Sequence, residues 1–151
     1  VMILLMLIGG SPGSTAGGMK TTTFMVLILN AIATFRSQEN AGAFGRRLEY
    51  HVIKNAATIA MLYFTLFFCG GIAISVYEGL PLLDCLYEAA SAVGTVGLTL
   101  GITPGLHIFS QVVLIMLMYL GRVGGLTLIY AVFSRRNKEN ARLPLEKITV
   151  G

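Results

Sequence analysis

The feature that most constrains this chain is an uncharged segment, Ala56–Tyr77, which is 22 residues long (56–77). As an α-helix it would measure about 33 Å, enough to cross the roughly 30 Å hydrocarbon core of a bilayer. A second uncharged run begins at His107 and leads to Arg122. Charged residues make up 12% of the chain, against about 25% in ordinary soluble domains. The sequence therefore predicts an all-α membrane protein.

The residues between the two runs are too short a segment to cross a bilayer. Leu80–Val93, which carries Asp84 and Glu88, would reach only about 21 Å as a helix. Asp84 and Glu88 lie four residues apart on one helix face and could draw cations to a pore mouth. Asp84 could equally well cap the start of the helix. The order of segments predicts a spanning helix, a re-entrant pore helix, a filter loop and a second spanning helix.

The loop that follows the short helix has the character of an ion filter. Potassium channels replace the water around the ion with backbone carbonyls of a TVGYG sequence, and this chain reads TVGLT at 95–99. Glycine allows the backbone angles with which successive carbonyls can face one axis. We predict a selectivity filter of Thr95, Val96, Gly97 and Leu98, with K⁺ bound by the backbone carbonyls of Thr95, Val96 and Gly97.

The N-terminal region reads as a broken helix. Apolar residues 1–8 look like half of a spanning helix, which suggests an incomplete chain; residues 9–20 hold five glycines and a proline, and a helix resumes over 21–35. Such a break at membrane depth is tolerated only beside protein or a water-filled cavity. A phosphate-binding loop is disfavoured because Met19 separates Gly18 from Lys20 and no strand precedes. A glycine-rich surface turn between soluble helices is the simpler alternative, against which the apolar flanks count.

Basic residues gather in two blocks at the ends of the apolar spans. By the positive-inside rule, the linker 36–55 and the tail 135–151 are cytoplasmic, which predicts a multi-pass protein of the cell membrane. A nucleic-acid-binding patch is the poorer reading, since the blocks flank apolar spans. Two cysteines and two distant histidines indicate neither a disulfide framework nor a metal site. The two blocks are Arg36, Arg46, Arg47 and Lys54, then Arg135, Arg136, Lys138, Arg142 and Lys147.

Arg122 is a charge placed well inside the last expected span, 107–134. Such a charge is costly in a membrane and usually faces a cavity or pathway. As straight helix, Arg122 lies about 20 Å from the cytoplasmic border and Lys20 about 24 Å from it. The glycine-rich loop and Arg122 are therefore expected at similar depth, below the filter. Gly121 and Gly125 form a GxxxG pair beside it that would permit close helix packing.

Three motifs carry a family resemblance: GGSPGSTAGGMKTT at 9–22, SAVGTVGLTLGITP at 91–104 and YLGRVGGLTL at 119–128. With them the chain resembles the C-terminal part of a Trk/Ktr/HKT-type potassium transporter, nearest the bacterial Ktr kind, and the tail 143–151 resembles that family's terminal segment. The resemblance implies four helix–loop–helix repeats around one pore. This chain would hold the end of the third repeat (1–35) and the whole fourth (56–134).

The resemblance also assigns roles. Residues 9–20 would form an intramembrane gate loop beneath the filter, touched by Arg122. Gly97 would be the glycine that each repeat contributes to the filter. It further implies K⁺ as the transported ion without a tightly bound cofactor, contact with membrane lipid, a homodimer of the full-length parent, a cytoplasmic nucleotide-binding regulatory subunit, and a transporter rather than an enzyme. The predicted gate residues are Gly9, Gly10, Ser11, Gly13, Ser14, Thr15, Gly17, Gly18, Lys20 and Arg122.

Two functions remain open on the sequence. The first is potassium uptake as part of a pore-forming subunit. The second is a non-conducting fragment or membrane scaffold that lacks the other repeats. Rubidium uptake by cells without their own potassium systems would separate the two.

Overall fold

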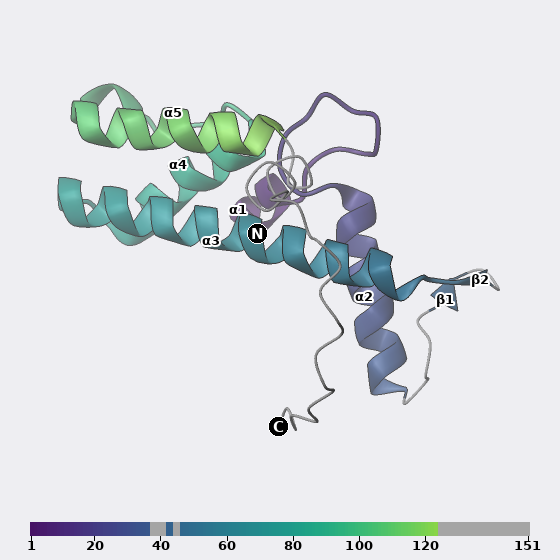
Figure 1. Cartoon of the computed structure of the whole chain (residues 1–151). Coiled ribbons are helices and arrows are strands. Elements are labelled where there is room, and N and C mark those ends of the chain that lie inside the picture. The colour runs from purple at the N-terminus through teal and green to yellow at the C-terminus, as the bar shows by residue number, and fades with distance from the viewer. Residues whose placement is uncertain (37–41, 44–45, 124–151) are drawn as a thin grey trace, which may run out of the picture.

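The computed structural model describes residues 1–36, 42–43 and 46–123 (Figure 1). This part of the chain is helical apart from one antiparallel pair of two-residue strands, which agrees with the predicted all-α class. The elements are α1 (Met2–Leu7), α2 (Thr21–Phe35), β1 (Gly42–Ala43), β2 (Arg46–Arg47), α3 (Tyr50–Glu78), α4 (Leu82–Gly94), the 3₁₀ turn η1 (Thr103–Gly105) and α5 (Ile108–Val123).

The expected spanning helix is present but longer than the uncharged segment. α3 begins at Tyr50, six residues before Ala56, so the expected linker 36–55 ends in helix. It stops at Gly79, which takes the left-handed conformation (φ 68°) that commonly ends a helix. In the part of the chain that the structure describes, α3 is the one helix long and apolar enough to cross a membrane.

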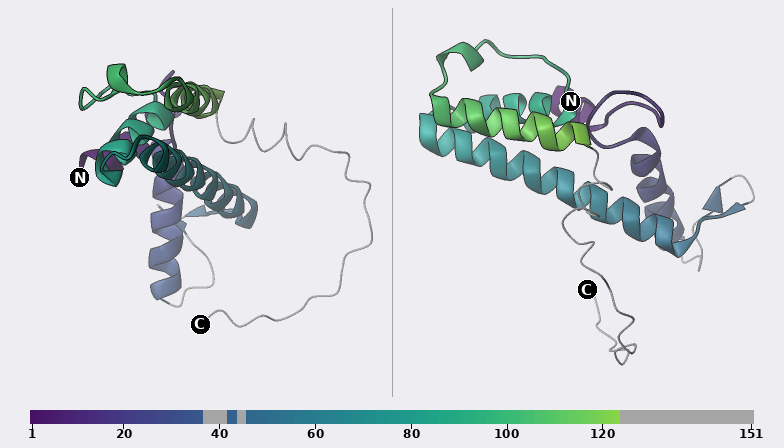
Figure 2. Two further views of the ribbon diagram at one scale, coloured as in Figure 1. Left: turned by 90° about the vertical axis from the view of Figure 1, so that its left-hand side faces the viewer. Right: turned by 45° about the horizontal axis from the view of Figure 1, so that its top comes forward.

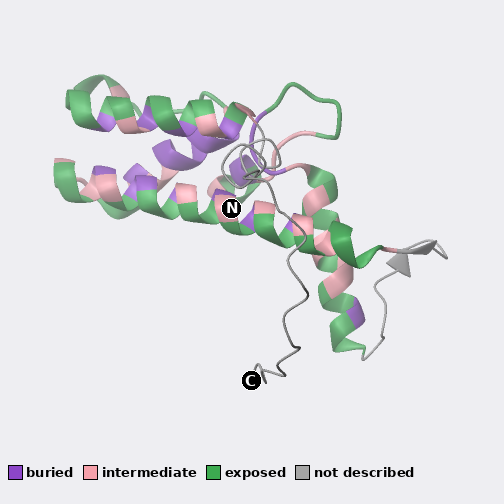
Figure 3. Cartoon of the chain, viewed as in Figure 1, coloured by how far each residue is buried: buried purple, intermediate pink, exposed green. Residues whose placement is uncertain are grey.

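α4 lies at the centre of the helical layer. It packs against α1, α3 and α5, and its second half, Ala89–Gly94, is buried. Small side chains in this half allow the neighbouring backbones to come close. The buried core gathers around it, with Ile74, Cys85 and Val93 fully enclosed. Figure 3 shows this burial on the inner faces of the helices.

α3 and α5 run antiparallel beside one another (Figures 1 and 2). Gly70 of α3 faces Leu117 of α5, and Gly71 faces Leu86 of α4. These two glycines of α3 therefore allow its neighbours to pack closely against it. The expected continuation of α5 to residue 134, Gly125 and the basic tail lie outside the described residues.

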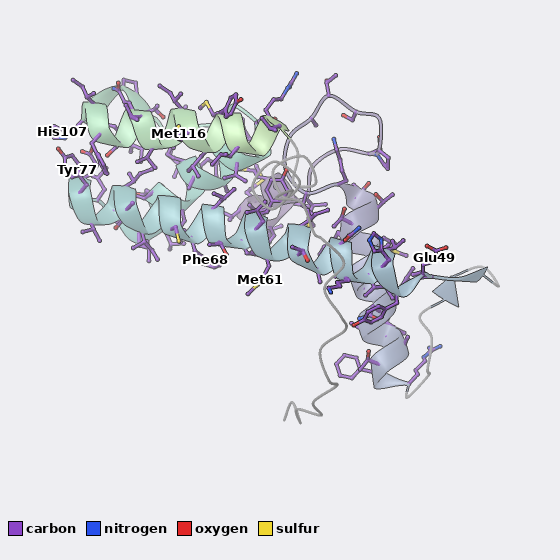
Figure 4. The ribbon with its side chains drawn as sticks, in the orientation of Figure 1. Glu49, Met61, Phe68, Tyr77, His107 and Met116 are labelled. Atoms are coloured by element: carbon purple, nitrogen blue, oxygen red, sulfur yellow. The ribbon has the colours of Figure 1, made fainter. Side chains whose placement is uncertain are left out.

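The opposite faces of α3 and α5 carry exposed apolar side chains. Met61 and Phe68 point away from the bundle on α3, and Met116 does so on α5 (Figure 4). Cys69 is also exposed on α3, whereas Cys85 is buried in the core. Apolar surface on this scale marks contact with lipid or with further protein.

Candidate functional site

The glycine-rich loop 9–20 is closed at its base. Gly9 N donates to Met19 O (2.6 Å), Met19 N donates to Leu7 O (3.2 Å) and Thr21 N donates to Gly10 O (3.3 Å). Residues 17–19 are buried, whereas residues 11–16 are exposed. The loop thus consists of a fixed base and a free tip, and the tip stands out beside the end of α5 in Figure 1.

Lys20 ties the tip back to the base. Its Nζ donates to Ser14 O (3.0 Å) and to Ala16 O (2.8 Å). The family resemblance implies that Arg122 touches this loop, but the Arg122 side chain is exposed and makes no hydrogen bond to the loop within the described residues. Lys20 is better placed to bond the loop carbonyls because it is the last residue of the loop itself. Any contact of Arg122 with the loop stays a prediction.

The base of the loop meets the end of α4 and the end of α5. Gly17 N donates to Thr95 Oγ1 (2.8 Å). Gly18 N donates to Gly121 O (3.3 Å), which also accepts from Tyr63 Oη (3.3 Å). Members of the predicted gate loop and of the predicted filter are therefore directly bonded, although they lie 78 residues apart in sequence.

Glycine is required where these segments touch. A Cβ on Gly121 would overlap Val93 O, one on Gly94 would overlap Met6 O, and one on Gly9 would overlap Gly17 O. At Gly17 it would lie 2.6 Å from both Thr95 Oγ1 and Thr95 Cγ2. We call the set Gly9, Gly17, Gly18, Gly94 and Gly121 the glycine junction. At Gly9, Gly94 and Gly121 backbone meets backbone, and at Gly17 backbone meets the Thr95 side chain, so an added Cβ has no room.

Thr95 ends α4 in an unusual way. It takes the left-handed conformation (φ 52°, ψ 39°) and is the one non-glycine residue of the described chain with a positive φ. Thr95 N donates to Ala92 O (3.1 Å) and Val96 N to Ser91 O (2.9 Å), the bond pattern of a Schellman motif. A β-branched residue is strained in this conformation. Its hydroxyl, however, is what accepts the Gly17 N–H.

The rest of the predicted filter is open. Val96, Gly97 and Leu98 are exposed. Gly97 has φ 84°, and among the described residues no heavy atom beyond its two chain neighbours lies within 4 Å of where its Cβ would be. The positive φ is the conformation for which the sequence predicts a glycine.

The carboxylate of Glu88 is buried and hydrogen-bonded. Its side chain is only 4% exposed, and Oε1 accepts from Thr99 Oγ1 (2.6 Å) and Leu100 N (2.9 Å), while Oε2 accepts from Thr103 Oγ1 (2.9 Å). Glu88 therefore holds the loop after the filter, and attraction of cations by Glu88 stays a prediction. The sequence signal for this bonding was a pair of threonines after the filter. Asp84 lies half-buried in the first turn of α4 and makes no cap bond.

A second carboxylate joins α3 to the start of α5. Glu78 Oε1 accepts from His107 N (2.8 Å) and Ser110 Oγ (2.6 Å), and Glu78 Oε2 is 2.8 Å from His107 Nδ1. His107 and Tyr77 lie at the same end of the bundle in Figure 4. His107 thus has a structural role, since it joins the start of α5 to the end of α3. No metal-binding cluster of acidic, histidine or cysteine residues occurs in the described ranges.

Comparison with known proteins identifies relatives over nearly the whole chain. Residues 1–140 match the TrkH family model, described as a cation transport protein. The chain is 38% identical to the potassium/sodium uptake protein NtpJ of Enterococcus hirae, covering 99% of this chain and 34% of that protein. It is 36% identical to the Ktr system potassium uptake protein B of Bacillus subtilis, covering 99% and 33%.

The match covers only part of these relatives. The chain spans about a third of the length of the relatives named above. The resemblance inferred from the three motifs is confirmed by a match that includes all of them. The chain belongs to the TrkH family of cation transport proteins.

Proposed function

We propose that this chain forms part of the pore-forming subunit of a Ktr-type system that takes up potassium across the cell membrane. We call that complete subunit the parent subunit. The names of the two relatives, which are potassium uptake proteins, support the ion. The observation that carries the proposal is the bond between Gly17 and Thr95, because it joins the two segments that such a pore needs to place next to one another.

The filter of this proposal is Thr95–Leu98. Carbonyls of Thr95, Val96 and Gly97 take the place of water around a K⁺ ion, each repeat of the parent subunit supplying one such strand. The exposure of Val96, Gly97 and Leu98 supports this role, since no side chain of the described residues packs over Gly97. α4 is then the re-entrant pore helix. Its burial against three other helices favours this role, because a rigidly packed helix can hold the filter in a fixed position.

The gate is the tip of loop 9–20. A fixed base and an exposed tip suit a segment that moves without unfolding its neighbours. Lys20 restrains the tip through two carbonyls, and its positive charge would oppose a cation in the same path until the tip moves. We place Arg122 near this path as well, as a second cation.

Partners and orientation follow the same proposal. Membrane lipid covers exposed apolar faces of α3 and α5. The two basic blocks, in 36–54 and 135–147, face the cytoplasm. The parent subunit forms a homodimer, and this homodimer docks a nucleotide-binding regulatory subunit. Basic residues alone would suit anionic lipid equally well. Co-purification of the regulatory subunit should therefore be lost when 36–54 and 135–147 are both deleted, and retention would remove the docking claim.

The test of the proposed function is rubidium uptake. Cells that lack their own potassium uptake systems are given the parent subunit, and uptake is measured with K⁺ or Na⁺ as competitor. We expect growth at low potassium and uptake that K⁺ inhibits more strongly than Na⁺. Membrane insertion without any uptake would favour the alternative, a non-conducting scaffold.

A further inference from the structure

The loop after the filter has few attachments of its own. Residues 96–101 are exposed, and Gly97 and Gly101 have positive φ with open space around them. Within the described chain, residues 97–101 donate no N–H to a backbone carbonyl. The Leu100 N–H bonds to Glu88, and the Gly101 N–H bonds to Thr99 Oγ1 (2.9 Å). Side chains therefore hold this loop in place.

Those attachments converge on Glu88. Both of its carboxylate oxygens are used, and all three donors come from residues 99–103. Thr99 Oγ1 and Thr103 Oγ1 also lie 2.9 Å apart, so the donors form one cluster around the carboxylate. Hydrogen bonds to a carboxylate are stronger than neutral ones, and burial strengthens them further.

Glu88 is also rigidly placed. It lies on α4 between buried residues, among them Cys85 and Ala89, and the same helix ends at Thr95. The carboxylate therefore links a fixed point on the pore helix to the far end of the filter strand. Residues 95–98 run between two anchors, which are the Thr95–Gly17 bond at one end and the Glu88 cluster at the other.

We propose that Glu88 is a positioning residue for ion selection, holding residues 99–103 so that the carbonyls of 95–97 keep the spacing that favours K⁺ over Na⁺. The inference rests on the proposed function. Glu88 does not bind the ion itself, since its oxygens are taken by three donors. A filter strand released at one end would adjust to a smaller ion and lose its preference.

The test compares ion preference rather than uptake alone. Rubidium uptake by the parent subunit is measured against increasing Na⁺ and K⁺, at equal amounts of protein in the membrane. For Glu88→Ala we expect the ratio of Na⁺ to K⁺ needed for half-inhibition to fall by about tenfold, the factor associated with one lost hydrogen bond to a charged group. Glu88→Gln keeps an oxygen for Thr99 and Leu100 and should retain most of the preference. Glu49→Ala, at the distant start of α3, is the matched control.

A second pair of variants covers the case in which Glu88→Ala does not fold. Thr99→Val and Thr103→Val remove donors at exposed or half-buried positions without leaving a cavity. Each should lower the ratio by a smaller factor, and Thr65→Val, an exposed threonine on α3, should leave it unchanged.

The outcomes are distinguishable. The role of Glu88 is overturned if the ratio is unchanged in Thr99→Val, in Thr103→Val and, where it folds, in Glu88→Ala. That result leaves the proposed function intact. An unmodified parent subunit that takes up no rubidium overturns both. A lowered ratio at normal protein level supports the proposal, because loss of folded protein alone would reduce uptake without changing the preference.

Discussion

Two regions around α4 and α5 are held together by opposite means. In the first, where α5 reaches Gly121, the glycine junction lets backbones touch directly. In the second, two carboxylates, Glu78 at the end of α3 and Glu88 midway along α4, accept hydrogen bonds from a loop and from the start of α5. The first region leaves no space for an added Cβ, whereas the second depends on side chains that can be exchanged one at a time. Substitutions should therefore behave differently in the two regions.

The largest effect is expected at the glycine junction. Gly121→Ala places a Cβ onto Val93 O, which is backbone and cannot turn away. Overpacking of this kind costs about 1–3 kcal/mol and sometimes more. Thermal unfolding of the parent subunit in detergent should show a marked fall in Tm. Gly105→Ala is the control, since no heavy atom of the described residues, its chain neighbours apart, lies within 4 Å of that Cβ. Equal Tm values for the two variants would contradict the close approach.

A somewhat smaller effect on stability is expected at Glu78. Glu78→Ala leaves Ser110, which is 0% exposed, and the His107 N–H without their acceptor. An unsatisfied buried polar group costs about 1–3 kcal/mol. Tm should fall, and Ser110→Ala on top of Glu78→Ala should recover part of the loss. If Tm does not recover in the double variant, the Ser110 hydroxyl does not depend on Glu78 as its acceptor. Glu49→Ala, whose side chain makes no cap bond at α3, should leave Tm unchanged.

Thr95 links the two kinds of attachment. Thr95→Val keeps the branched shape but removes the acceptor for Gly17 N–H, a loss of about 0.5–1.5 kcal/mol. We expect faster amide exchange at Gly17 and increased protease access to the loop tip, with exchange in α3 unchanged. The claim of a direct link fails if Gly17 exchange matches that of the unmodified protein.

The smallest effect on stability is expected at Lys20. Its bonds to Ser14 O and Ala16 O are exposed, so Lys20→Met should change the free energy of unfolding by less than about 1 kcal/mol. Freeing the tip and removing its charge should nevertheless raise the rate of rubidium uptake. The same direction is expected on shortening residues 11–16 or for Arg122→Ala. A folded protein with a shortened tip that conducts no faster would make the loop structural.

The sequence predicted what depends on local pattern. The uncharged run 56–77, the short segment after it and the glycines of 9–20 were enough to predict α3, α4 and the interrupted helix at the N-terminus. The charge-free run underestimated α3 because Tyr50–Asn55 adds polar turns that helical hydrogen bonding accepts equally well. Boundaries of this kind depend on caps rather than on hydropathy.

Contacts between distant segments could not be predicted in the same way. Nothing in the pattern distinguishes Lys20 from Arg122 as the donor to the loop carbonyls, because both are cations at similar expected depth. The bonding of Glu88 gave no local signal either, since its partners, Thr99 and Thr103, come back to it only through the turn of the loop. The left-handed conformation of Thr95 could not be predicted either, because a threonine gives no local signal for that conformation.

The most direct test of the account is the ion preference of Gly97→Ser in the parent subunit. A Cβ at this position meets no atom of the described residues beyond its chain neighbours, so the protein should still fold, but φ 84° disfavours a non-glycine residue and the carbonyl row should be disturbed. Rubidium uptake in competition with Na⁺ and K⁺ should show a clear loss of preference for K⁺ or of apparent affinity. Gly105→Ser should show neither. Unchanged preference and affinity in a folded Gly97→Ser protein would contradict the assignment of 95–98 as the filter.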